Sequence, residues 1–102
     1  MTAHRIGPLA ELWAGDLVAA QVAGTRLLVV RIGDEVHAYE DRCAHLGVAL
    51  SEGTLDGEVL TCAAHHWTYD VSTGRGINPR TACLVRFPVT IEHGVIYVEL
   101  AR

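Results

Sequence analysis

The sequence predicts an all-β fold, a small antiparallel sandwich or barrel, and three observations support this expectation. Short apolar segments alternate with turn signals along most of the 102 residues. Half of the residues are hydrophobic and 20% are charged, a composition that can form a packed core and excludes a disordered chain. The length corresponds to one domain, residues 1–102, with no room for a second.

The expected strands are segments rich in Val, Ile, Leu or aromatic residues that end at Gly, Asp or Pro. They cover residues 16–21, 26–32, 36–39, 58–61, 67–71, 84–87, 89–92 and 95–100. Gly33-Asp34 and His93-Gly94 are expected to form hairpin turns between such segments. Helical character is expected only over residues 8–12, where a proline stands in the first turn.

Charge, hydropathy and cysteine number exclude several classes of protein. The longest aliphatic run covers residues 27–30, whereas a membrane span needs about 20 apolar residues. No secretory signal is visible, so we expect a cytoplasmic protein. The net charge is −4 and all eight basic residues are Arg, which disfavours nucleic acid and membrane surfaces as partners. Three cysteines, an odd number, argue against a disulfide framework.

Two segments combine Cys and His at the ends of expected strands. The first reads C-A-H at residues 43–45 and the second C-A-A-H at 62–65. Four ligands of these types suit either zinc or an iron–sulfur cluster. A Cys₂His₂ zinc finger pairs its two Cys and places both His on a helix, whereas here each segment holds one of each. Two loops can instead bring both Cys to one metal and both His to another, as in a Rieske [2Fe–2S] centre.

The chain resembles the Rieske-type ferredoxins, and among them the ferredoxins of the toluene monooxygenases. Those systems belong to the soluble di-iron aromatic and alkene monooxygenases. The resemblance covers essentially the whole chain and is densest from Cys43 to Pro88. Besides the two Cys and His segments, it is carried by L-S-E-G at 50–53, H-W-T-Y-D at 66–70 and S-T-G-R-G-I-N-P at 72–79. Ferredoxins of ring-hydroxylating dioxygenases usually have Gly or Gln where this chain has His66.

This resemblance implies one [2Fe–2S] Rieske cluster and a role for four residues. Cys43 and Cys62 would bind one iron through thiolates, and His45 and His65 would bind the other through imidazole nitrogens. The fold implied is a small antiparallel β-sandwich, the Rieske or ISP fold, with a two-loop cluster-binding subdomain at one end. We place its loops at about residues 41–54 and 62–70.

Two aromatic residues after the second segment are expected to influence the cluster. Tyr69 occupies the position of a Tyr that donates to a Cys sulfur in respiratory Rieske proteins, and Trp67 replaces a Ser that donates to a sulfide. Hydrogen bonds to sulfur raise the reduction potential, and the Ser donor is absent here. We therefore expect a reduction potential toward the low end of the Rieske range of about −150 to +300 mV. Trp67 is expected to shield the cluster, meet a partner, or both.

Other residues near the loops receive simpler interpretations. Cys83 is expected to be a small buried hydrophobe, and His66 an exposed loop residue. The acidic residues that flank the loops in sequence are expected to form a solvated rim or to face a basic partner: Glu40, Asp41, Glu52, Asp56 and Glu58.

The function implied is one-electron transfer in a multicomponent oxygenase of aromatic hydrocarbon or alkene catabolism, without catalytic residues of its own. A flavin and iron–sulfur reductase oxidises NADH, and a monomeric ferredoxin carries single electrons to a di-iron hydroxylase through transient complexes. Three alternatives remain open: the ferredoxin of a Rieske ring-hydroxylating dioxygenase, the small subunit of an NADH-dependent nitrite reductase, and a zinc-binding module.

Overall fold

A computed structural model of the chain describes residues 2–12, 15–43, 49–63 and 66–100. Within these ranges every element is a β-strand except two 3₁₀ turns, and every strand pairing is antiparallel. The expected all-β antiparallel fold is therefore confirmed. No helix in the described part of the chain is long and apolar enough to cross a membrane.

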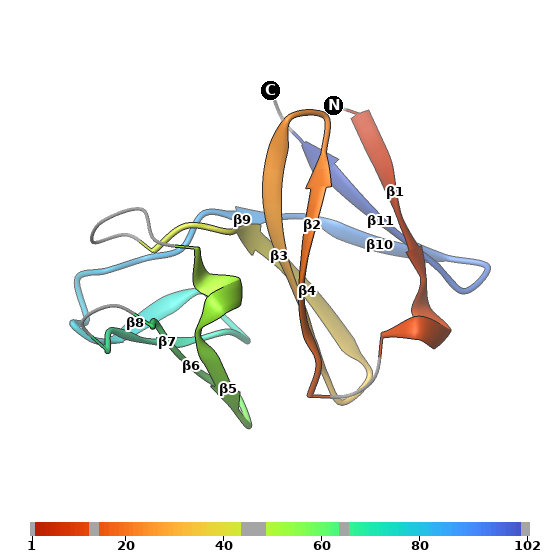
Figure 1. Cartoon of the computed structure of the whole chain (residues 1–102). Helices are drawn as coiled ribbons and strands as arrows, with labels where there is room; N and C mark the ends of the chain where they lie inside the picture. Colours follow the sequence, from red (N-terminus) through yellow and green to blue (C-terminus); the bar gives the residue numbers. More distant parts are fainter. Residues whose placement is uncertain (1, 13–14, 44–48, 64–65, 101–102) are drawn as a thin grey trace.

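The elements follow one another along the chain as labelled in Figure 1. The 3₁₀ turns are η1 (Leu9–Glu11) and η2 (Leu50–Glu52). The strands are β1 (Thr2–Pro8), β2 (Leu17–Val22), β3 (Thr25–Ile32), β4 (Glu35–Glu40), β5 (Thr54–Asp56), β6 (Val59–Thr61), β7 (Thr68–Asp70), β8 (Arg75–Asn78), β9 (Arg86–Phe87), β10 (Val89–Glu92) and β11 (Val95–Leu100).

The strands form three sheets. The outer sheet has the order β1-β11-β10, the central sheet β2-β3-β4-β9 and the small sheet β5-β6-β7-β8. Figure 1 shows the central sheet between the other two, with the small sheet on the left and the outer sheet on the right. The central and outer sheets together make the sandwich, which we call the base, and the small sheet lies beside it.

Strand β3 is buried on both faces, which explains the longest aliphatic run of the sequence. Leu27 and Val29 belong to the core between the central and outer sheets, whereas Leu28 and Val30 belong to the core that the central sheet shares with the small sheet. Successive side chains of a strand point to opposite faces, so the four consecutive residues serve two cores. Each of the four is at most 1% exposed.

The predicted turns and the predicted helical turn are confirmed. Gly33-Asp34 joins β3 to β4 between the paired residues Ile32 and Glu35. His93-Gly94 joins β10 to β11, with φ of 51° and 74°. Positive φ at both central residues is what a tight type I′ hairpin requires. The 3₁₀ turn η1 lies inside the expected residues 8–12.

Three observed strands have no counterpart among the predicted segments. Strand β1 forms along β11, from the pair Thr2 and Leu100 to the pair Pro8 and Val95. Strands β5 and β8 are the two edges of the small sheet and contain three and four residues. These strands lack a strong apolar alternation of their own and form by pairing, β1 with the distant β11 and β5 and β8 with the neighbouring strands β6 and β7.

Tyr39 joins the base to the small sheet. It is fully buried on β4, and its hydroxyl donates to the carbonyl of Val71, 2.5 Å away, directly after β7. Gly74 lies against its ring: a Cβ there would be 2.9 Å from Cε1 of Tyr39, and φ is +84°. Burial raises the pKa of the Tyr39 hydroxyl to about 12, although the Arg86 guanidinium opposes the rise.

Candidate metal centre

Cys43 follows strand β4 and lies at the start of the first predicted loop. It is 2% exposed, and the hydroxyl of Tyr69 is 3.3 Å from its Sγ. Tyr69 stands on β7, opposite Leu60 of β6, so the contact joins the first loop to the small sheet. A phenol hydroxyl at this distance can donate a hydrogen bond to a sulfur atom, especially to a thiolate.

Cys62 follows strand β6 and is 1% exposed. Its backbone N–H donates to the carbonyl of Trp67 at 2.8 Å, which closes the turn that contains the second Cys and His segment. Thr61, just before it, pairs with Thr68 of β7. The antiparallel β6–β7 pair therefore fixes where this second turn begins and ends.

The two cysteines share one core although 18 residues lie between them in the sequence. That core also contains Tyr39, Leu60 and Tyr69. All three cysteines of the chain lie in the described residues, and none is in a disulfide. Two buried thiols that face one core, with a hydroxyl near one of them, fit a pair of thiolate ligands to a metal.

The other two predicted ligands, His45 and His65, lie outside the described residues. Each is two or three positions beyond a described cysteine, in the order C-x-H and C-x-x-H. Within the described ranges, no group of three or more His, Cys, Asp or Glu side chains gathers where it could hold a metal ion. Of the four predicted ligands, the described residues include only the two cysteines.

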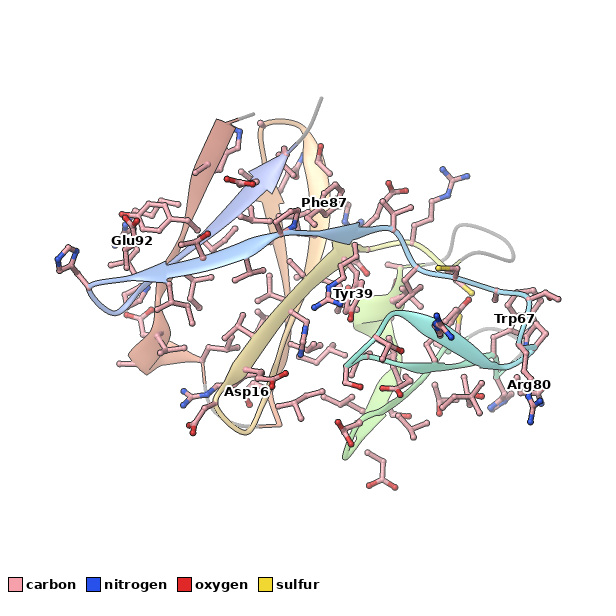
Figure 2. All side chains as sticks on the ribbon, turned by 180° about the vertical axis from the view of Figure 1, so that it is seen from behind. Asp16, Tyr39, Trp67, Arg80, Phe87 and Glu92 are labelled. Atoms are coloured by element: carbon pink, nitrogen blue, oxygen red, sulfur yellow. The ribbon has the colours of Figure 1, made fainter. Side chains whose placement is uncertain are left out.

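Trp67 packs against the core that contains the two cysteines and is partly exposed. Figure 2 shows Trp67 and Arg80 at the same end of the molecule, away from the outer sheet. Arg80 is exposed and follows Pro79 at the end of β8. His66 is exposed and has a positive φ of 55°, in agreement with the expectation of an exposed loop residue.

Asp41 departs from the expectation of a solvated acidic rim. It is 5% exposed, and its carboxylate accepts hydrogen bonds from the backbone N–H and the Oγ of Ser51, at 2.8 and 2.7 Å. An ion pair links it to Arg26 at 3.5 Å. The interpretation as a surface residue was wrong because sequence neighbourhood does not reveal a partner ten positions away.

Asp56 and Glu58 are exposed, but they lie away from the cysteines. In the β5–β6 hairpin the pair Thr54 and Thr61 is next to Cys62, whereas the pair Asp56 and Val59 is at the other end. Glu58 stands in the turn at that far end. Their sequence position beside the loops therefore does not place them beside the candidate site.

The expectation for Cys83 was also wrong, because this cysteine is exposed. Ala82 and Leu84 on either side of it are buried. The chain is extended here and forms an isolated bridge to Arg75, so the alternation of side chains turns Cys83 outward. Its Sγ donates to the carbonyl of Leu84 at 3.5 Å.

Comparison with known proteins identifies what the chain is similar to. The sequence model of the Rieske [2Fe-2S] domain matches residues 2–88. The chain is 40% identical over 90 residues to the ferredoxin component of the alkene monooxygenase system of Xanthobacter autotrophicus, which covers 86% of this chain and 73% of that protein. It is 42% identical over 79 residues to ferredoxin CarAc of Metapseudomonas resinovorans, with 76% and 74% covered.

Solved structures agree with these relatives. The ferredoxin of carbazole 1,9a-dioxygenase from Nocardioides aromaticivorans superposes with a TM-score of 0.87 at 30% identity, covering 96% of this chain and 97% of that one. A chain in the complex of reduced oxygenase and oxidised ferredoxin in carbazole 1,9a-dioxygenase gives a TM-score of 0.87 at 35% identity, covering 94% and 91%.

Proposed function

The chain belongs to the family of Rieske [2Fe–2S] domains, and we propose that it serves as the ferredoxin of a di-iron monooxygenase system of the toluene, aromatic or alkene type. The Rieske fold, the single Rieske cluster and the class of electron-transfer ferredoxin, expected from the sequence, are confirmed by the comparisons. The two relatives compared above are named as a ferredoxin component and as a ferredoxin, so the protein is an electron carrier and not a catalytic subunit.

In this proposal Cys43 and Cys62 hold one iron and His45 and His65 hold the other. The burial of both thiols in one core supports the thiolate half, and the C-x-H and C-x-x-H spacing supports the imidazole half. When bound, the cluster accepts and releases one electron. The single domain of residues 1–102, with loops at about 41–54 and 62–70, remains part of the proposal.

The surrounding residues control access to the site and the charge on its sulfur ligands. The Tyr69 hydroxyl is placed to donate to Cys43 Sγ, which stabilises negative charge on that sulfur. Trp67 packs against the core that contains the cysteines, where it is proposed to shield the cluster. The remaining chemistry needs no acid or base, because the task of the protein is to carry an electron to another protein.

The observation that carries the choice of system is the 40% identity to an alkene monooxygenase ferredoxin over 86% of the chain. A resemblance to the monooxygenase branch at His66-Trp67 and at residues 76–79 supports the same choice. The second candidate is the ferredoxin of a ring-hydroxylating dioxygenase. The 42% identity to CarAc over 76% of the chain favours that candidate.

The partners proposed are an NADH-oxidising flavin and iron–sulfur reductase and a di-iron hydroxylase, in the cytoplasm. Complexes that pass electrons are weak and bury under about 1,200 Å² in total, so the ferredoxin is proposed to act as a monomer that leaves each partner after transfer. The net charge of −4 gives no support for nucleic acid or an anionic membrane as a partner.

Cross-reconstitution tests the choice of system. The purified ferredoxin is combined with NADH and a reductase, and then with either a toluene or alkene di-iron hydroxylase or a carbazole-type dioxygenase oxygenase. The proposal expects product formation with the di-iron hydroxylase. If product forms with the dioxygenase oxygenase and not with the di-iron hydroxylase, the monooxygenase proposal is wrong and the second candidate replaces it.

A further inference from the structure

The carboxylate of Asp41 joins the two ends of the first loop. Asp41 directly follows strand β4, and Ser51 lies in η2 ten residues later. Ser51 donates to Oδ1 through its backbone N–H at 2.8 Å and to Oδ2 through its Oγ at 2.7 Å. Cys43 and His45 lie in the segment that this contact closes.

Both ends of this contact are themselves anchored. The backbone N–H of Asp41 donates to the carbonyl of Arg26 at 3.0 Å, which ties the first end to β3. At the second end, Leu50 is fully buried in the core that contains Cys43 and Cys62. Gly53 follows with no room for a side chain, because a Cβ there would lie 2.1 Å from the carbonyl oxygen of Thr61. The contact therefore connects two ends of the loop that are each held by the rest of the fold.

Asp41 also places a negative charge two residues before Cys43. Its side chain has no exposed surface, and a carboxylate is buried at large cost unless it is hydrogen-bonded or paired. The only cation paired with it within the described residues is Arg26, at 3.5 Å and with 60% of its side chain exposed. Such an exposed cation offsets a buried negative charge only in part.

We propose that Asp41 is a positioning residue for the cluster: it joins the two ends of the first loop through Ser51 and holds a negative charge two residues before the proposed ligand Cys43. This inference rests on the proposed ligand roles of Cys43 and His45. Because this contact holds the two ends of the loop together, we expect that its loss speeds release of the cluster. Its charge opposes the arrival of an electron and so lowers the reduction potential.

The charge is tested by protein-film voltammetry on two variants of the cluster-loaded protein. Asp41→Asn removes the negative charge and keeps an oxygen that can accept from Ser51, so the potential is expected to rise. Arg26→Gln removes the partner cation, so the potential is expected to fall. Shifts of opposite sign support the proposal. A loosened loop alone would move both variants in one direction, and that result, or no shift in either, overturns the charge role.

The loop closure is tested by the rate at which the visible absorption of the cluster is lost in a ferrous-iron chelator with reductant. Ser51→Ala removes the Oγ donor and leaves both charges, and it is expected to release the cluster about tenfold faster, which corresponds to ~1.4 kcal/mol. Asp41→Ala is expected to release it at least as fast, and Asp41→Asn to recover part of the loss.

Ser72 provides a matched control. Its backbone N–H and Oγ donate to Oδ1 of Asp70 at 2.9 and 2.6 Å, the same chemistry on a turn that holds no predicted ligand. Ser72→Ala is expected to release the cluster at the wild-type rate. Equal rates for Ser51→Ala and wild type overturn the closure role. Wild-type protein that holds no iron and sulfide overturns the proposed function itself, so the two failures are distinguishable.

Discussion

The base and the small sheet of this molecule are stabilised in different ways. The base has strands of up to eight residues, and apolar side chains such as Leu27, Val29 and Val98 fill its core. The strands of the small sheet have three or four residues, too few to be stable by themselves. Its core contains two cysteines and two tyrosines, and single contacts such as Asp41 with Ser51 fix its loops.

This difference indicates that the base provides a stable platform and that the small sheet carries the candidate site. The base depends on apolar burial, which needs no ligand, and it offers one face of the central sheet as a platform. The small sheet uses that platform and the side chains that reach across it, such as Leu28 and Tyr39. We infer that the cluster, when bound, supplies much of the remaining stability of the small sheet, because metal binding couples to folding.

The largest expected effect comes from Cys62→Ser. This variant is expected to lose iron and sulfide completely and to leave the small sheet open while the base stays folded. The measurements are iron and sulfide content and amide hydrogen exchange, with Leu60 and Tyr69 losing protection and Val29 keeping it. Cys83→Ser is the control, because its thiol is exposed and the cluster should be retained. A variant that unfolds throughout would contradict the division between base and small sheet.

Leu27→Ala and Leu28→Ala separate the two cores directly. The residues are adjacent on β3, equally buried, and on opposite faces. Each variant is expected to lower the free energy of unfolding by about 2–5 kcal/mol, as buried Leu truncations do. Only Leu28→Ala should also accelerate cluster release in the chelator assay. Equal acceleration in both variants would mean that the two cores are not independent.

Gly53→Ala tests the close contacts of the small sheet. Its Cβ would meet the backbone carbonyl of Thr61, which cannot move without shifting β6. We expect a loss of about 1–3 kcal/mol in unfolding free energy, measured by denaturant titration, together with faster cluster release. Gly7→Ala is the matched control, because nothing lies within 4 Å of its Cβ position. If both variants have the same unfolding free energy and the same rate of cluster release, the close approach at Gly53 does not contribute to stability.

Tyr39→Phe has the smallest expected effect at neutral pH, about 1 kcal/mol for the lost hydrogen bond to Val71. Its consequence grows at alkaline pH, because the buried phenol has a pKa of about 12. The unfolded chain ionises near pH 10, so the wild type loses stability on the order of 2–3 kcal/mol between pH 10 and 12. Unfolding free energies measured from pH 8 to 12 should fall less steeply in the variant. Parallel curves would contradict this role of Tyr39.

Local signals predicted much of the base. The hairpins at Gly33-Asp34 and His93-Gly94 depend on turn chemistry that adjacent residues determine. Strand β1 was not predictable in this way, because it forms only by pairing with β11 at the far end of the chain. The sequence showed a run of four aliphatic residues in the central sheet. It did not show that the two faces of that sheet contribute to two different cores.

The candidate site was predicted from its ligand spacing, whereas its supporting contacts were not. The spacing and the resemblance pointed to Cys43 and Cys62, which the structure places in one core. The burial of Asp41 depends on Ser51, and the exposure of Cys83 on the alternation around it, neither of which residue type reveals. The roles of His45 and His65 remain predictions, since both lie outside the described residues.

Cys43 and Cys62 are proposed to hold one iron, and His45 and His65 the other. A Mössbauer spectrum of the oxidised protein, grown on ⁵⁷Fe, distinguishes the two irons, because iron bound by thiolates and iron bound by imidazoles have different isomer shifts. Two quadrupole doublets of equal area with distinct isomer shifts are expected. A single doublet, as two equivalent thiolate-bound irons would give, or a colourless protein that carries zinc would contradict this assignment.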